Sequence, residues 1–126
     1  MAREAFQYTV LQVVPRVERG ERMNAGVVLY SRRHRFLEAR IGLDLARLAA
    51  LDPGADPDEV ERHLGALGRV AAGDASAGAV AHMPQSERFH WLAAPSSTII
   101  QPSAVHTGLC DDPAATLDRL FATLVR

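Results

Sequence analysis

The segment between residues 15 and 29 holds the most concentrated polar chemistry of the chain. Five charged residues, two glycines and a single asparagine lie there between two apolar runs that are typical of β-strands. Arginine presents planar N–H donors that suit a carboxylate or a phosphate group. The segment therefore supplies four candidate residues for ligand or partner binding: Arg19, Glu21, Arg22 and Asn24.

Three further candidates lie elsewhere in the chain. Arg40 falls within an expected strand, and on the same face as Asn24 the two side chains would form a shared polar patch. His106 and Thr107 lie before the last expected helix, where His106 is a candidate general base. The two aspartates at the start of that helix would repel a phosphate group, which weakens the case for an anion site there.

The candidates in the first segment also have structural interpretations, which the sequence leaves open. Glu21 beside Arg19 can be a solvated ion pair of small energetic value. Asn24 can bond its own backbone in an Asx turn. Gly20 is expected to take a positive φ, and Gly26 to mark a bulge or a close contact within a strand.

The chain lacks the sequence signatures of common catalytic and cofactor sites. No phosphate-binding loop, dinucleotide fingerprint or nucleophile elbow occurs in it. The five histidines show no paired spacing on a helix, and Cys110 is the single cysteine, so we expect no metal site, no cofactor and no disulfide. The aspartates that follow Cys110 disfavour its thiolate, so a small, partly buried side chain is expected there.

Length and composition are those of one ordinary globular domain spanning residues 1–126. The hydrophobic share is 48%, the charged share 23% and the net charge −1, with every basic residue an arginine. Nucleic-acid-binding domains usually carry a basic excess, so no nucleic-acid partner is expected. No apolar run approaches the roughly 20 residues of a membrane helix, and no secretory signal precedes the first strand. We therefore expect a cytoplasmic protein without a membrane interaction.

The apolar pattern predicts an α+β fold. Strands are expected at residues 6–14, 24–30, 36–41, 89–93 and 98–100, with a loop at 73–86 and an irregular segment at 102–111. Phe89 and Trp91 share a parity in the fourth of these strands and are expected in the core.

Three helices complete the expected fold. A short one at 43–51 begins at Asp44, a second begins at Asp56 and Pro57 and runs to about residue 72, and a C-terminal amphipathic helix begins at Asp112 and Pro113. The result is a mainly antiparallel sheet of about five strands, covered on one face by helices. The other face is expected to be solvated or to receive a partner.

The same residues carry a resemblance to a known family. The chain resembles the bacterial family named domain of unknown function 3037 at Tyr8–Val10, Pro15, Arg19–Glu21, Asn24, Gly26, Val27–Leu29, Ala39–Arg40 and Thr107–Leu109. The resemblance covers essentially the whole chain. The family has no established activity, so the resemblance assigns none to this chain. Members are often encoded beside kinases similar to the HipA toxin type, which implies an accessory or regulatory role.

Two functional hypotheses follow. The first is a non-catalytic accessory or regulatory domain that binds a protein partner, with a HipA-like kinase encoded nearby as the suspected partner. The second is a small enzyme, or a protein that binds a nucleotide or phosphate ligand, whose polar cluster is built from Arg19, Glu21, Asn24, Arg40 and His106. The second hypothesis requires these side chains to converge on one pocket. The sequence leaves the oligomeric state open.

Overall fold

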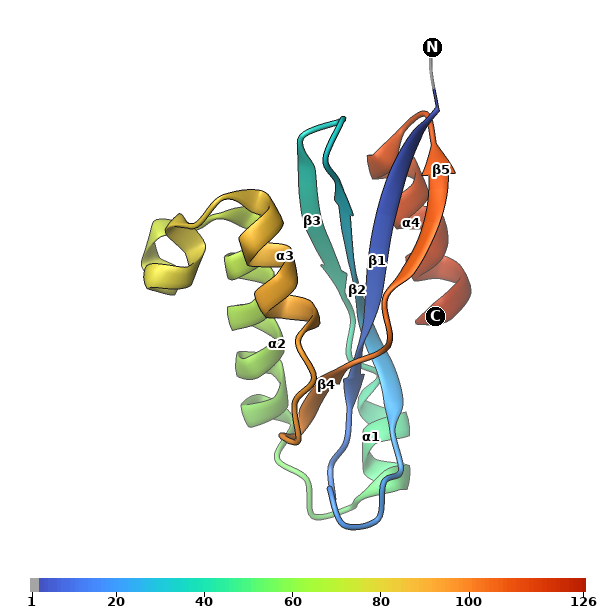
Figure 1. The fold of residues 1–126 in the computed structure, drawn as a ribbon. Coiled ribbons are helices and arrows are strands. Elements are labelled where there is room, and N and C mark those ends of the chain that lie inside the picture. The colour runs from blue at the N-terminus through green and yellow to red at the C-terminus, as the bar shows by residue number, and fades with distance from the viewer. Residues whose placement is uncertain (1–2) are drawn as a thin grey trace.

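The structure, a computed structural model, describes residues 3–126 as a five-stranded sheet with helices packed against it (Figure 1). In chain order the elements are β1 (Glu4–Val13), β2 (Met23–Ser31), β3 (Phe36–Ile41), α1 (Leu45–Leu51), α2 (Pro57–Ala72), α3 (Gln85–Ala93), β4 (Ile100–Pro102), β5 (His106–Cys110) and α4 (Pro113–Leu124). Two short 3₁₀ helices, Ala75–Ala77 and Ala79–His82, precede α3. Within the described residues, no helix combines the length and the apolarity needed to cross a bilayer.

The long strand β1 organises the sheet. On one side it pairs with β2, which in turn pairs with β3. On its other side β1 is shared by two short strands, because Leu11–Val13 pairs with β4 and Glu4–Tyr8 pairs with β5. All four pairings are antiparallel, so the expected α+β class with a mainly antiparallel five-stranded sheet is confirmed.

Helices cover both faces of the sheet, and the expectation of cover on one face was wrong. α2 and α3 pack on one face and α4 packs on the other (Figure 1). The reason lies in β2, where Val27 and Leu29 join the α4 core while Val28 and Tyr30 join the α2 and α3 core. A strand that is apolar on both sides is stable only when both sides are shielded from water.

The helix starts match their sequence signals. Asp56 accepts hydrogen bonds from the backbone N–H groups of Asp58 and Glu59 at 3.0 and 3.4 Å, with Pro57 at the first helical position. Asp112 caps α4 in the same way through the N–H of Ala115. These caps confirm the expected starts of both helices.

Several segments differ from the sequence prediction. Two 3₁₀ helices and the start of α3 fall in the loop predicted at 73–86, and the strand predicted at 98–100 lies at Ile100–Pro102. Residues 89–93, predicted as a strand, form the end of α3, and residues 106–110, predicted as irregular, form β5. Phe89 and Leu92 are both buried three positions apart, which is the spacing of a helix face. β5 is an edge strand with mostly exposed side chains, so it carries no alternating apolar signal; its pairing with β1 defines it.

A β-bulge in β2 sets the direction of Asn24. Leu11 pairs with Gly26 and the next residue, Gln12, pairs with Asn24, so Ala25 is an extra residue in the ladder. A Cβ at Gly26 would lie 3.0 Å from a backbone oxygen of β3, which confirms the close approach expected there. The extra residue shifts the alternation by one, and Asn24 therefore faces α4.

Candidate functional site

Arg19 and Glu21 lie at the exposed tip of the β1–β2 connection. Gly20 between them has a φ of 71°, as expected for this turn. Arg19 Nε donates to Glu21 Oε1 at 2.7 Å, and this bond lowers the pKa of Glu21 and raises the pKa of Arg19. Both side chains are about half exposed, so solvent screens the pair and it contributes little to stability.

Arg22 and Asn24 belong to a chain of hydrogen bonds that ends on α4. Arg22 Nη1 donates to Gln12 Oε1 at 3.3 Å, and Gln12 Nε2 donates to Asn24 Oδ1 at 3.1 Å. Asn24 Nδ2 then donates to the carbonyl oxygen of Leu124 at 2.9 Å. The prediction of an Asx turn at Asn24 was wrong. The bulge directs the side-chain amide toward α4, where it bonds to Leu124, and not toward its own backbone.

Arg40 also contacts α4. Its Nε donates to Asp118 Oδ1 at 2.9 Å and its Nη1 donates to Glu38 Oε1 at 3.3 Å. Burial acts to lower the pKa of Arg40, but the hydrogen bonds to Glu38 and Asp118 outweigh it and the pKa is raised. Arg40 and Asn24 do share a face of the sheet, and each side chain holds a different turn of α4 against it.

His106 and Thr107 lie on β5, away from the other candidates. The ring of His106 stacks on Tyr8, with centroids 5.2 Å apart, and Thr107 is exposed opposite Gln7. Tyr8 and the Asn24 partner Gln12 are four residues apart on β1, which is about 13 Å along a strand. The seven candidates therefore occupy three separate places: the hairpin tip, the contact with α4, and the β5 edge.

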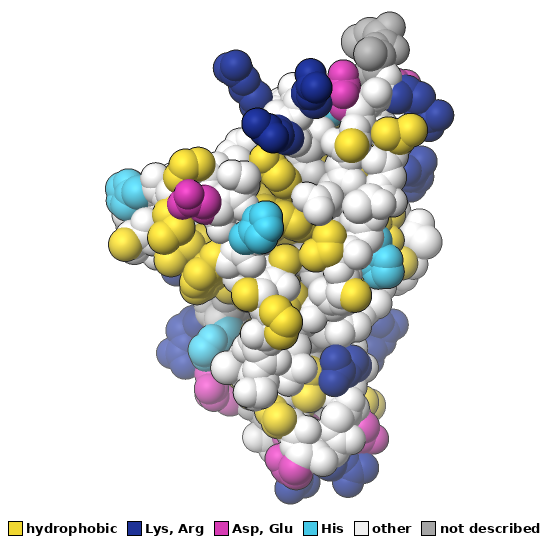
Figure 2. All heavy atoms as spheres, viewed as in Figure 1, with side chains coloured by type: hydrophobic (Ala, Val, Ile, Leu, Met, Phe, Trp, Pro, Cys, Tyr) yellow, Lys and Arg dark blue, Asp and Glu magenta, His cyan; other side chains and the backbone are white. Residues whose placement is uncertain are grey.

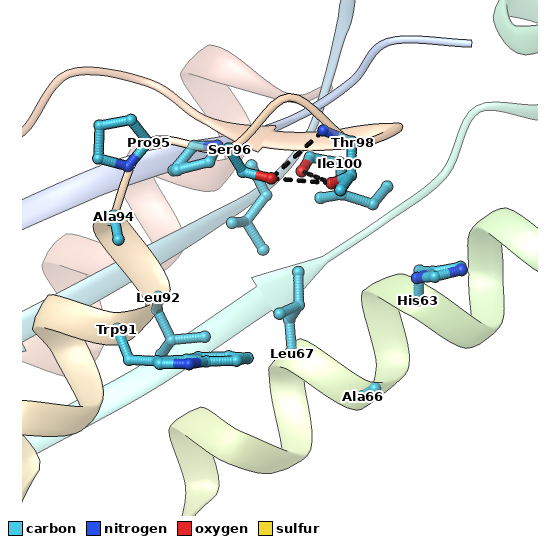
Figure 3. A pocket seen from close by; sticks show the side chains of 12 residues that line it. His63, Ala66, Leu67, Trp91, Leu92, Ala94, Pro95, Ser96, Thr98 and Ile100 are labelled. Atoms are coloured by element: carbon cyan, nitrogen blue, oxygen red, sulfur yellow. Dashed lines mark hydrogen bonds between the residues drawn. The ribbon is translucent and has the colours of Figure 1, made fainter. Parts of the chain in front are cut away.

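A pocket that involves none of the seven candidates lies between α2, α3 and the segment that follows α3 (Figure 3). Its volume is about 450 Å³. Leu67 projects from α2 between Trp91 on α3 and His63 on α2, while Ser96 and Thr98 lie on the segment that crosses above them (Figure 3). None of its twelve lining residues is Asp, Glu or Arg, so the pocket suits a neutral, largely apolar group.

The polar groups of this pocket are occupied by local structure. Ser96 Oγ and Thr98 Oγ1 are 3.0 Å apart, Thr98 N donates to Ser96 Oγ, and Thr98 Oγ1 donates to the carbonyl of Ile100. Neither hydroxyl has a histidine partner, and His63 has no carboxylate in the pocket to orient it. The arrangement supports binding and provides no nucleophile–base pair.

Trp91 is the feature of this pocket that sequence reasoning placed wrongly. Trp91 was expected in the core, but 47% of its surface is exposed, whereas Phe89 and Leu92 are buried. A helix rotates successive side chains by about 100°, so Trp91 cannot share the inward direction of its neighbours. Figure 2 shows apolar side chains gathered over α3 and the adjoining segment, with arginines toward the two ends of this face.

Metal binding has no geometric support in the part of the chain that the structure describes. Among residues 3–126, no three His, Cys, Asp or Glu side chains are close enough to hold one ion. Cys110 is a buried free thiol in the core beneath α4, as its sequence context predicted.

Comparison with known proteins gives one match. Residues 8–125 match the family described as "Protein of unknown function (DUF3037)", which confirms the resemblance carried by the β1–β2 segment. No curated protein and no solved structure matches the chain. The matched region includes the hairpin, the contacts with α4 and all the residues that line the pocket.

Proposed function

The chain belongs to the DUF3037 family, and on that premise we propose that it is a non-catalytic accessory or regulatory domain that binds a protein partner. The observation that carries this proposal is the half-exposed Trp91 beside an uncharged pocket of about 450 Å³. Tryptophan is enriched among the residues that dominate binding energy at protein interfaces. The partner contributes an apolar side chain to the pocket, and Trp91 packs against the segment that carries it.

The charge distribution favours a neutral partner segment. A charged side chain in this pocket would lose its hydration without gaining an ion pair, because no Asp, Glu or Arg lines it. The surrounding apolar surface in Figure 2 extends the contact beyond the pocket. Such an arrangement, with an aromatic anchor and an apolar centre, resembles the core of a protein interface.

A kinase of the HipA type is the first partner to test. The resemblance of the chain to its family implies such a neighbour, and an accessory domain that binds a kinase would change the kinase's activity or stability. Arg19 and Glu21 are proposed as a secondary contact, because their side chains lie exposed at the hairpin tip and bond to each other alone among the described residues.

The alternative, a small enzyme or a phosphate-ligand-binding protein, has less support. Its five polar residues lie in three places, and two of them, Asn24 and Arg40, hold α4. No arginine lines the pocket beside Trp91, so a phosphate group would find no counter-charge there. A nucleotide that binds with its phosphate at Arg19 would nevertheless restore this alternative.

Co-purification with the neighbouring kinase tests the proposal. We expect the wild-type protein to form a stable complex and Trp91→Glu to lose it, because a buried unpaired carboxylate is costly at an interface. Leu45→Glu is the matched control, since Leu45 is another exposed large hydrophobic residue, lies on α1 and does not line the pocket. A complex that forms equally well with Trp91→Glu contradicts the proposed surface.

A further inference from the structure

The strand β5 has a free edge. Among the described residues it pairs with β1 alone, and Figure 1 shows no strand beyond it. The backbone groups on the outer side of β5 are therefore open to another strand. Such an edge is where a second chain can extend a sheet.

This edge lacks the features that usually prevent pairing. Residues 103–110 contain no charged residue and no proline. Proteins commonly protect an exposed edge with lysine, proline, a bulge or an inward-pointing charge. Val105 and Leu109 instead expose 40% and 58% of their surfaces here. An uncharged edge strand with exposed apolar side chains favours pairing with a strand of another chain.

The segment 105–109, which consists of Val105 and the first four residues of β5, is complementary to itself. In an antiparallel pair centred on Thr107, Val105 of one copy lies opposite Leu109 of the other, and each Thr107 faces its equivalent. On the opposite face, His106 lies across from Gly108, over which the ring of Phe6 packs. Facing apolar pairs and facing threonines are favourable cross-strand pairs.

We propose that two copies of this chain pair through β5, antiparallel and about a two-fold axis at Thr107, to form one continuous sheet. A second copy is the occupant that fits this edge, because the two exposed apolar residues, Val105 and Leu109, lie at equal distances on either side of Thr107 and so face each other across the two-fold axis. The uncharged strand also avoids the like-charge repulsion that a two-fold axis would otherwise impose. The pocket beside Trp91 is not part of this edge, so the dimer does not depend on partner binding there.

The mass of the protein in solution tests the dimer. Sedimentation equilibrium of the wild type across a wide concentration range should show reversible dimerisation. Thr107→Lys places two ammonium groups opposite each other and should raise the dimer dissociation constant about tenfold or more. Thr123→Lys makes the same change at an exposed position of α4 and should leave the dimer intact. A monomeric wild type, or a Thr107→Lys variant that dimerises normally, overturns the proposal.

A cross-linking variant keeps the test valid if Thr107→Lys folds poorly. In a facing cross-strand pair the Cβ atoms lie about 4.5–5.5 Å apart, close enough for a disulfide after a small adjustment. Thr107→Cys should therefore form a covalent dimer under mild oxidation, whereas Thr123→Cys should not. Cys110 is buried and should not contribute. Failure of the folded Thr107→Cys variant to cross-link faster than Thr123→Cys contradicts the register.

Discussion

The side-chain amide of Asn24 donates a 2.9 Å hydrogen bond to the carbonyl oxygen of Leu124, one hundred positions further along the chain. This carbonyl lies in the last turn of α4, where helix geometry leaves oxygens without an internal partner. Arg40 makes a second tie to the same helix through Asp118. The polar residues of β2 and β3 thus fix the position of α4 on the sheet.

Replacing Asn24 should destabilise the fold. Asn24→Ala leaves the Leu124 carbonyl and the Gln12 amide without their partner, so we expect a loss of about 1–3 kcal/mol in the free energy of unfolding. Urea denaturation, monitored by circular dichroism, measures this change in the free energy of unfolding. Arg22→Ala is the control, because it removes only exposed hydrogen bonds, to Gln12 and to the Gly20 carbonyl, and should change stability by less than about 0.5 kcal/mol. Equal effects for the two variants would show that the tie to α4 contributes nothing.

Truncation of the α4 core should be most damaging at Leu117. This side chain is completely buried, so Leu117→Ala should lower the free energy of unfolding by about 2–5 kcal/mol. Phe121 is only partly buried, with its ring beside Gly42, and Phe121→Ala should have the smaller effect despite its larger volume change. Denaturation curves that rank Phe121→Ala above Leu117→Ala would contradict the packing of α4.

The ion pair at the hairpin tip should be visible in a pH titration. Arg19 holds the pKa of Glu21 below its ordinary value, so the small contribution of this pair to stability is present above that ordinary value and is lost as the pH falls through the lowered pKa. In Arg19→Ala the pKa of Glu21, followed by NMR of its carboxyl carbon, should rise toward the ordinary value. Glu18 is the internal control, because its pKa is lowered mainly by its own backbone and by Arg16. An unchanged Glu21 titration would mean that the pair does not persist in solution.

The sequence predicted those elements whose signals are local. The first three strands follow from dense apolar and β-branched residues, and the starts of α2 and α4 follow from an aspartate cap and a proline. α3 was missed because a short run around Phe89 and Trp91 reads equally well with either periodicity. β5 was missed because an exposed edge strand has no apolar pattern, and its pairing with β1 is not visible locally.

The candidate site was less predictable than the fold. Asn24 was a candidate as the only asparagine of the chain. Its hydrogen-bond partner, however, is distant in sequence, and the contact depends on a bulge that no local motif predicts. The pocket is assembled from α2, α3, the segment after α3, β4 and one side chain of β1. No single segment carries its signal.

The fluorescence of Trp91 tests the proposed binding surface most directly, because it is the only tryptophan of the chain and lines the pocket. The measurement is a titration of the protein with a tryptophan-free variant of the neighbouring kinase, with acrylamide quenching before and after. Burial of the half-exposed indole should shift its emission to shorter wavelength and reduce its quenching, and both changes should saturate with complex formation. A kinase that binds while the emission and quenching of Trp91 stay unchanged would contradict the account, since the partner would then contact another surface.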